Sequence, residues 1–437
     1  MAQQVNPPRG MRDFLPAEKA RREAILGVIR DSYRAHGFDE IETPVAEDSK
    51  WLHAGLGGDN EKLAFAILKR GDEFEKALPT ARTPLDLADL GLRFDLTVPL
   101  ARFYATHRAE LPTPFRAIQI APVWRAERPQ KGRYRQFVQC DIDIIGEAGP
   151  LAEIELLTAT AATIRALGIT EFSLRVNDRR LLVAMLDHFG FPAQSHDGVL
   201  ITIDKLDKIG VDGVIGELTE RAADVAAVEA LRAFFLRPQT REFLPFGEAQ
   251  IRKALPDGLE HPAIAELVAI GEAVLSSAHR SLSEIEGPDQ LVQYDPWLVR
   301  GMGYYTGPIF EAVHPELGYS IGGGGRYDGM IGRFLGQDVP AAGFSLGFER
   351  FVDLVELPGA GAAGTVAIVY DPVAAPSVVV AARDRFIADG RPVRLVRRPK
   401  QLAKTLDALA ADGVREFVLI DPTTDPTTVE PRPLESR

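Results

Sequence analysis

The spacing of apolar side chains predicts an N-terminal helix followed by a sheet. In residues 17–36, Leu26, Ile29 and Tyr33 fall on one helical face, and Gly37 is suited to end the helix. Composition and alternation predict four strands after the short extended segment FDEIETP: 92–100, 115–127, 134–146 and 170–176. The polar, glycine-containing stretch RPQKGR separates the second and third strands, which predicts a loop between two antiparallel strands.

The rest of the chain predicts an interrupted core and a separate tail. A helix is expected at 151–167, and the mostly helical, polar residues 178–290 carry no strong site signal, which indicates an inserted helical module. Strands return at 308–313 and 317–323, before a helix at 345–356. The tail alternates strand and helix, which predicts parallel pairing. The expected domains are a core of 1–177 and 291–356, the insertion 178–290, a linker 357–364 and an α/β unit 365–437.

Charge and composition restrict the function classes. The chain has a net charge of −12, with −13 in the first 364 residues and +1 in residues 365–437, which disfavours a protein that coats nucleic acid in general. No stretch approaches the roughly 20 apolar residues of a membrane span, and MAQQVNPPRGMRDF lacks the apolar run of a signal peptide. Cys140 is the single cysteine, which excludes an intramolecular disulfide and a cysteine-based zinc cluster. We therefore expect a cytoplasmic protein without a membrane segment.

Two glycine-rich stretches have different implications. The series Gly359, Gly361 and Gly364 formally matches a dinucleotide fingerprint, but it follows a predicted helix and enters a strand, so it indicates a linker. The run from Gly322 to Gly325 is no P-loop because no Lys-Ser/Thr follows it. It is typical either of a tight turn or of backbone that approaches a ligand closely.

Charged residues near the predicted strands indicate chemistry with an anion. Six arginines adjoin these strands: Arg125, Arg133, Arg135, Arg300, Arg326 and Arg350. Arginines gathered around one strand pair repel unless an anion lies among them, and a nucleoside triphosphate suits their planar fork. Asp95, Asp141 and Asp143 lie in otherwise apolar surroundings and either pair with these arginines or hold an ammonium, an imidazole or a metal. The residues alone thus indicate an ATP- or phosphate-using enzyme on an antiparallel sheet.

The chain resembles histidyl-tRNA synthetases along nearly all its length. PPRGMRDFLP resembles the family's opening segment, and the first helix with FDEIETP resembles the dimer-forming first motif of class II synthetases. VWRAERPQKGRYRQFVQCDIDIIG is similar to the second motif with its tRNA-acceptor loop, and GFSLGFERF to the third. LVRGMGYYTGPIFE and GGGGRYDG resemble the two histidine-specific signatures. The resemblance implies an α+β catalytic domain on an antiparallel sheet flanked by helices, a helical insertion and a C-terminal α/β anticodon-binding domain.

The resemblance also implies a function and a set of site residues. The activity would be a histidine–tRNA ligase that uses L-histidine, ATP with its accompanying Mg²⁺, and tRNA(His), and that forms a homodimer through the first motif. The histidine-binding residues would be Asp95, Thr97, Arg125, Gln139, Asp143, Arg300, Tyr304 and Tyr305. The ATP-binding residues would be Arg125, Glu127, Arg133, Phe137 and Arg350. Arg125 and Arg300 would be catalytic, Gln130, Lys131 and Arg133 would form the acceptor loop, and no residue is assigned to a protein-held metal.

Three departures from the family pattern accompany the resemblance. Met302 and Gly303 replace the usual Leu-Asp in the first histidine signature, and positions 95 and 143 carry Asp where many bacterial members have Glu. The Pro/Thr-rich tail after Ile420 suggests that the anticodon domain lacks its last strand and helix. The alternative function is a paralogue that senses histidine as the regulatory subunit of ATP phosphoribosyltransferase. Such paralogues typically lose the acceptor loop, the ATP-handling arginines and the anticodon domain.

Overall fold

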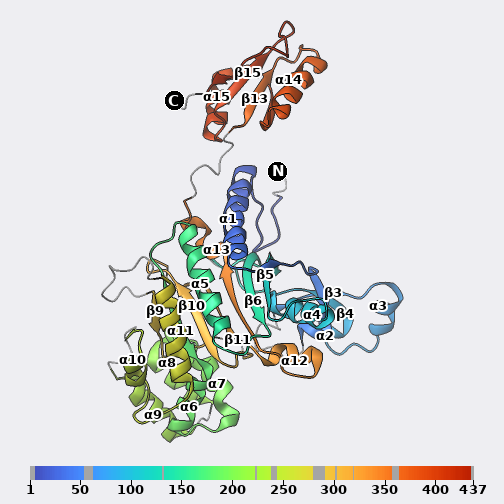
Figure 1. The fold of residues 1–437 in the computed structure, drawn as a ribbon. Coiled ribbons are helices and arrows are strands. Elements are labelled where there is room, and N and C mark those ends of the chain that lie inside the picture. Colours follow the sequence, from blue (N-terminus) through green and yellow to red (C-terminus); the bar gives the residue numbers. More distant parts are fainter. Residues whose placement is uncertain are drawn as a thin grey trace. The chain divides into compact units, whose positions relative to one another are not determined.

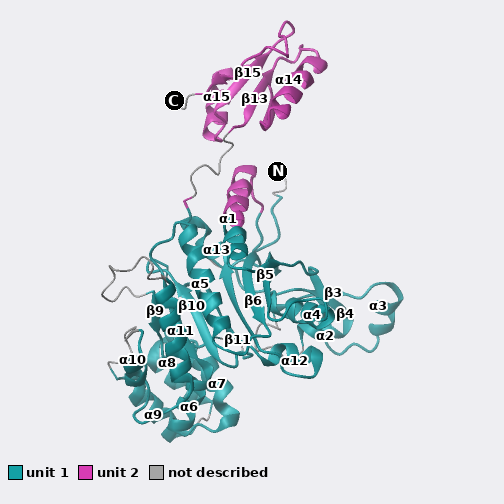
Figure 2. Ribbon diagram, viewed as in Figure 1, with its two compact units in different colours: residues 1–12, 28–355 teal, residues 13–27, 356–437 magenta. Residues whose placement is uncertain are grey.

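The computed structural model describes residues 5–53, 63–129, 132–221, 224–237, 244–278, 291–300, 303–317, 319–356 and 364–434. These residues belong to two compact units, residues 1–12 with 28–355 and residues 13–27 with 356–437 (Figure 2). Residues 357–363 of the predicted linker, including Gly359 and Gly361, lie outside the described residues. Within the described parts, no helix is both long and apolar enough to cross a bilayer.

A large mixed sheet forms the centre of the first unit (Figure 1). Over the described residues its order is β1-β5-β6-β12-β11-β10-β7-β9-β8. The strands are β1 (Asp39–Glu40), β5 (Phe115–Trp124), β6 (Gln136–Ile145), β7 (Ser173–Asp178), β8 (Leu244–Pro245), β9 (Val292–Tyr294), β10 (Pro308–Val313), β11 (Ser320–Arg326) and β12 (Ala341–Gly347). β1 with β5 and β7 with β9 are parallel, and the other neighbours are antiparallel. The predicted antiparallel pair is confirmed, because β5 and β6 run in register from Phe115 opposite Ile145 to Trp124 opposite Gln136.

The two faces of β6 have different chemistry. Cys140, Ile142 and Ile144 are fully buried on one face. Two helices that pack against each other cover the sheet, α5 (Leu151–Ala166) on β6 and β12 and α11 (Ala263–Ala278) on β7 and β9 (Figure 1). Residues 139, 141 and 143 alternate with the apolar set and therefore point to the opposite face. The N-terminal helix α1 (Pro16–Ala35) buries Ile29 and Tyr33, as its periodicity predicts.

The expected strand at 92–100 is wrong. A strand, β4 (Ala88–Leu92), ends where the prediction begins, and helix α4 (Thr97–His107) follows it. Asp95 Oδ1 accepts a hydrogen bond from the backbone N–H of Val98 at 3.3 Å, and Pro99 stands in the first turn, where its missing N–H costs nothing. Local capping thus outweighs the strand preference of Thr97 and Val98.

The first unit also contains a smaller sheet, which precedes α4 in the chain, and several short helices. The sheet has the order β2-β4-β3, with β2 (Ala46–Asp48) and β3 (Phe65–Leu68) both antiparallel to β4. The short helices are α2 (Ser49–Leu52), α3 (Gly71–Ala77), α12 (Gly329–Leu335) and α13 (Phe348–Phe351). The expected helix at 345–356 is shorter than predicted because β12 extends to Gly347.

The segment predicted as a helical insertion is mainly helical where it is described. Its helices before α11 are α6 (Arg179–Phe189), α7 (His196–Ile203), α8 (Leu206–Glu220), α9 (Val225–Phe235) and α10 (Glu248–Ala254). Helix α8 has a kink at Gly210, whose φ of 68° is left-handed. The segment also supplies strand β8, which pairs with β9 at the edge of the large sheet.

The tail forms a small α/β fold of its own. Its strands have the order β14-β13-β15-β16, and its elements are β13 (Val366–Tyr370), α14 (Pro376–Ala388), β14 (Val393–Arg397), α15 (Leu402–Ala411), β15 (Glu416–Ile420) and β16 (Arg432–Pro433). The predicted parallel pairing is confirmed, since β13 is parallel to both β14 and β15. The two-residue β16 pairs antiparallel with β15 after the Pro/Thr-rich segment, and the expectation that the domain is incomplete stays a prediction. The described residues 421–434 contain no helix.

Candidate active site

A cavity of about 960 Å³ lies on the polar face of the large sheet. It brings together residues that are far apart in the sequence: Asp95, Thr97, Arg125, Glu127, Arg133, Phe137, Gln139, Asp143, Arg300, Tyr304, Tyr305 and Arg350. Every described residue that the resemblance assigns to histidine or ATP therefore lines one cavity. Gln130 and Lys131 lie outside the described residues. The geometry fixes the location of the predicted set, whereas the individual roles stay predictions.

One end of the cavity is acidic and buried. Asp95, Asp141 and Asp143 are exposed by 2%, 5% and 5% of their surfaces. Burial, and then the charge of Asp95, raise the pKa of Asp143 to about 7, although Tyr327 donates a hydrogen bond to it. Burial and then Asp143 raise the pKa of Asp141 well above its usual value, and burial raises that of Asp95 against the opposing charge of Arg125. Three carboxyl groups that disfavour one another's ionisation form a site suited to a cation or to N–H donors.

Gln139 supplies an uncommitted acceptor at the same end. Its Nε2 donates to Ser345 Oγ at 2.9 Å and to Asp141 Oδ2 at 3.2 Å. Its Oε1 is buried and has no hydrogen-bond partner among the residues that the structure describes. A buried amide oxygen without a partner is costly, so its position in the cavity indicates that a ligand donor satisfies it.

Three tyrosines form the wall beside Asp143. The ring of Tyr304 lies 4.8 Å from that of Tyr305 and 6.1 Å from that of Tyr327. Tyr327 donates its hydroxyl hydrogen bond to Asp143 Oδ1 at 2.6 Å. The sequence places Tyr327 within a histidine signature but indicates no role for it, because the neighbour of its hydroxyl is set by the fold. The partner of Asp143 is therefore a tyrosine rather than one of the arginines considered from the sequence.

A second part of the lining is basic and adjoins the acidic part, since Arg125 acts on Asp95 and Arg300 on Tyr305. Arg125, Arg133, Arg300 and Arg350 form this part, and Arg300 Nη1 lies 2.8 Å from Glu311 Oε1. Arg125 donates from Nε to the Phe94 carbonyl at 2.9 Å, with its guanidinium carbon 5.1 Å from the ring centre of Phe137. Burial, and then repulsion from the three other arginines, lower the pKa of Arg350 to about 10. Such mutual repulsion favours binding of a polyanion.

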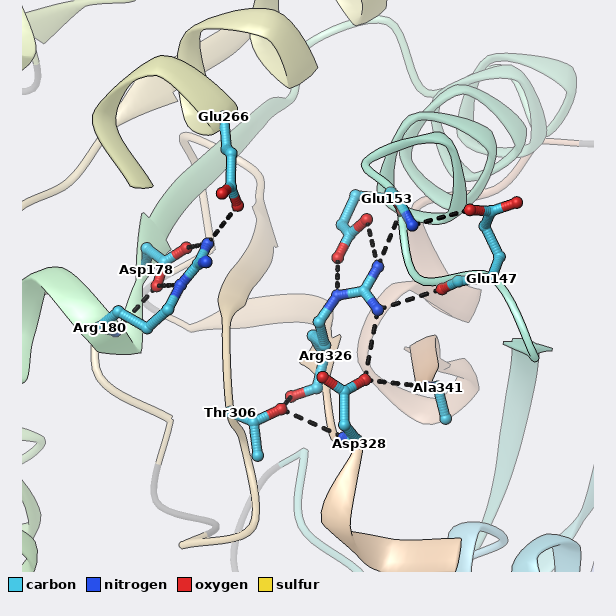
Figure 3. Close-up of polar contacts among 10 residues, drawn as sticks. Glu147, Glu153, Asp178, Arg180, Glu266, Thr306, Arg326, Asp328 and Ala341 are labelled. Carbon is cyan, nitrogen blue, oxygen red and sulfur yellow. Dashed lines mark hydrogen bonds and ion pairs between the residues drawn. The ribbon is translucent and has the colours of Figure 1, made fainter. Parts of the chain in front are cut away.

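Two of the six arginines do not line the cavity. Arg326 forms a buried ion pair with Glu153, and its Nε lies 2.6 Å from Glu153 Oε1 (Figure 3). Arg135 donates from Nε to the Glu127 carbonyl at 3.0 Å. The hypothesis that all six arginines surround one anion is therefore wrong for these two, which hold protein segments together instead.

The glycine run is a buried strand rather than a turn. A Cβ at Gly323 would lie 2.7 Å from the guanidinium carbon of Arg300, and one at Gly343 on β12 would overlap Asp143 Oδ1. These glycines leave space for side chains of the site. The close approach to the glycine backbone that was considered from the sequence therefore occurs, and it is made by protein side chains. The tight-turn interpretation of the run is wrong, because Gly322–Gly325 pair along β10 and β12.

Two further segments reach the cavity without a sequence signal. Asp204, at the end of α7, and Asp207 and Lys208, in the first turn of α8, line it, although the predicted insertion showed no site pattern. Glu349, also in the lining, accepts hydrogen bonds from the Val138 N–H and from Arg12 of the opening segment. Their proximity depends on tertiary packing, so neither composition nor spacing indicates it.

Comparison with known proteins identifies the family. A sequence model described as Histidyl-tRNA synthetase matches residues 10–351. A histidine–tRNA ligase of Leifsonia xyli subsp. xyli is 57% identical over 440 residues, with 99% of each chain covered. A probable histidine–tRNA ligase of Tropheryma whipplei is 43% identical, with 97% of each covered.

Solved structures share the fold at lower sequence identity. A histidyl-tRNA synthetase from Nostoc sp. PCC 7120 superposes with a TM-score of 0.72 at 23% identity, covering 99% of this chain and 97% of that one. A Bacillus halodurans protein described as an ATP phosphoribosyltransferase regulatory subunit/histidyl-tRNA synthetase gives 0.73 at 21%, covering 97% and 100%. Together with the sequence matches over most of its length, this shared fold establishes that the chain belongs to the histidyl-tRNA synthetase family.

Proposed function

We propose that the protein is a histidine–tRNA ligase, which activates L-histidine with ATP and transfers it to tRNA(His). The observation that carries the proposal is the composition of the cavity lining, in which buried carboxyl groups and a Gln139 oxygen without a partner among the described residues lie beside four arginines. An amino acid with N–H groups and a nucleotide with phosphates match this composition. The 57% identical relative carries the same activity in its name.

The acidic end binds histidine. Asp95, Thr97 and Gln139 receive the α-ammonium group, and Asp143 accepts a hydrogen bond from an imidazole N–H. Tyr304 and Tyr305 enclose the ring. Tyr327 already donates to Asp143 Oδ1, which leaves the other carboxylate oxygen available to the ligand. An acceptor at this position selects imidazole over an apolar ring of similar size.

The basic end binds ATP and its accompanying Mg²⁺. Phe137 stacks on adenine, Glu127 contacts its edge, and Arg133 and Arg350 reach the outer phosphates. Arg125 and Arg300 contact the α-phosphate. A histidine carboxylate oxygen attacks the α-phosphorus, a bond to the bridging oxygen breaks, and pyrophosphate leaves with that electron pair. The protein contributes position and positive charge where negative charge develops, because it forms no covalent bond itself.

The second step requires tRNA. A ribose hydroxyl of the terminal nucleotide attacks the histidyl carbonyl, and AMP leaves. Gln130, Lys131 and Arg133 form the acceptor loop, and the unit 365–437 contacts the anticodon stem. We further propose a homodimer formed through the first motif, and a cytoplasmic location because translation consumes the product.

ATP–pyrophosphate exchange with each of the twenty amino acids tests the first step. We expect exchange with L-histidine alone. Histidine binding without exchange would support the regulatory-subunit alternative, a function that is also named for the Bacillus halodurans protein. The presence of Arg125, Arg300 and Arg350 in one cavity favours the ligase, since a histidine sensor has no need for them.

A further inference from the structure

A buried arginine outside the cavity has every donor engaged. Arg326 is 8% exposed and Glu153 is 1% exposed. Arg326 Nε and Nη2 donate to the two carboxylate oxygens of Glu153 at 2.6 and 2.8 Å (Figure 3). Nη2 also donates to the Gly149 carbonyl, and Nη1 donates to the Glu147 carbonyl and to Asp328 Oδ1. These five bonds match the five N–H groups of a guanidinium and fix it in position.

This arginine connects three segments that carry the histidine pocket. The carbonyls of Glu147 and Gly149 belong to the turn after β6, the strand of Asp143. Tyr327, which donates to Asp143, is the next residue in the chain. The Arg326 carbonyl accepts the N–H of Thr306 at 2.8 Å, and Thr306 directly follows the two cavity tyrosines.

Asp328 belongs to the same hydrogen-bond network and links Arg326 to β12 and to Thr306. Its Oδ1 accepts the N–H of Ala341 at 3.0 Å, at the start of β12. Its own N–H donates to Thr306 Oγ1 at 3.1 Å (Figure 3). The loop that carries Tyr304 and Tyr305 is therefore held from outside the cavity, next to the Gly303 departure from the family pattern.

We propose that the Arg326–Glu153 pair positions the histidine pocket: it sets the spacing between Asp143 and the tyrosines without touching the ligand. The proposal rests on the proposed binding of histidine at this end. The basic end is held by other contacts, since Arg350 Nη1 donates to the Ser320 carbonyl at 2.8 Å and Arg125 to that of Phe94. The pair therefore controls histidine affinity and leaves ATP affinity unchanged.

Arg326→Lys tests the proposal, because lysine keeps the charge but loses the planar fork. In the full-length protein, the KM for histidine in exchange and the calorimetric Kd for histidine should both rise, by about tenfold to a hundredfold, as a misplaced pocket predicts. The KM for ATP should stay at the wild-type value. An equal rise for both substrates, or no change for histidine, would overturn the proposal.

Arg180→Lys is the matched control. Arg180 forms a comparable fork with Asp178 at 3.0 and 2.7 Å and a bond to Glu266 at 2.7 Å, so its partners lie on β7 and α11 (Figure 3). Its histidine Kd should match the wild type. A rise equal to that of Arg326→Lys would show a general effect of losing an ion pair and would refute the positioning role.

A second variant covers the case in which Arg326→Lys does not fold. Thr306→Val removes the two hydroxyl contacts of Thr306, which accepts from the Asp328 N–H and donates to the Arg326 carbonyl, and it should also raise the Kd for histidine selectively. An unchanged Kd in a folded Thr306→Val, with Arg326→Lys unfolded, would overturn the proposal. If the wild type binds histidine but performs no exchange, the ligase function fails, yet the calorimetric comparison still decides the positioning role.

Discussion

Asp143 combines a structural cost with the histidine-binding role that we propose for it. Burial raises its pKa to about 7, whereas an unfolded aspartate titrates near about 3.9. The folded protein therefore binds one more proton than the unfolded chain between these values, so its stability falls as pH rises toward 7 and stays lower above it. In the proposed role, the ionised carboxylate of Asp143 strengthens histidine binding, but it lowers the stability of the protein without ligand.

Asp143→Asn should separate these two effects. At pH 8, where free imidazole is neutral, we expect weaker histidine binding by about 1.5–3 kcal/mol, the range for a hydrogen bond to a charged group, and nearly unchanged ATP binding. Without ligand, the variant should be more stable than the parent at pH 8, with a difference that shrinks toward pH 4. Calorimetry and urea unfolding at both pH values measure this. Equal weakening of both ligands would make Asp143 a structural residue.

Substitution of Arg300 should slow adenylate formation strongly while it changes the affinity for histidine little. Arg300 stands over Gly323 and pairs with Glu311 at 2.8 Å, which orients it toward the proposed α-phosphate position. Arg300→Ala should raise the activation barrier by about 3–4 kcal/mol, as loss of a charge-stabilising donor does, and leave the histidine Kd nearly unchanged. Pre-steady-state adenylate formation gives the rate, and Arg300→Lys shows what charge alone restores. A normal rate in folded Arg300→Ala would exclude it from catalysis.

Among the elements, strand β11 is important because its glycines leave room for side chains of neighbouring segments. Gly323→Ala would place a methyl group 2.7 Å from the Arg300 guanidinium carbon and 2.8 Å from the Phe310 carbonyl oxygen. We expect exchange activity to fall by about a hundredfold, because a displaced catalytic group loses its alignment. Gly329→Ala is the control, since its Cβ would meet nothing within 4 Å at the start of α12. Similar losses in both variants would contradict this explanation.

Elements with strong local signals were predictable from the sequence, and those fixed by context were not. Alternation over ten residues identified β5 and β6. Thr97 and Val98 suit a strand in isolation, but they form the first turn of α4, where the Val98 N–H donates to Asp95. The glycine run contains no apolar side chain, so only its neighbours in the sheet reveal β11. Likewise, motif resemblance located the cavity set, while the contacts of Tyr327, Asp204 and Glu349 follow from packing alone.

At the scale of the whole molecule, we expect the two proposed chemical steps to depend on different parts of the chain. All residues of the cavity lie between 95 and 350, within the first unit. The tail has its own core around Val366, Ile368 and Phe386. Its basic residues in β14 and in the segment leading into α15 are partly neutralised, because Arg394 pairs with Asp412 at 2.8 Å and Arg398 with Asp371 at 3.8 Å.

A chain ending at residue 356 should therefore retain histidine-dependent exchange. Charging of tRNA should weaken, mainly through a higher KM for tRNA, because phosphate contacts of the tail are lost. The salt dependence of that KM should also become shallower. Exchange and aminoacylation assays on both proteins measure the outcome, and circular dichroism confirms folding. Loss of exchange in a folded truncated protein, together with normal charging of tRNA, would contradict the proposal that residues up to 356 form the adenylate and that the tail contacts tRNA.

The cavity wall made by Asp204, Asp207 and Lys208 has a kinetic consequence beyond binding. A histidyl-adenylate is a mixed anhydride, and water competes with the tRNA hydroxyl for its carbonyl. We expect the segment that lines the cavity with these residues and with Gly210 to keep water away from the proposed adenylate. We expect a variant in which water reaches the cavity through this wall to consume ATP still, but to hydrolyse the adenylate to free histidine and AMP in a futile cycle.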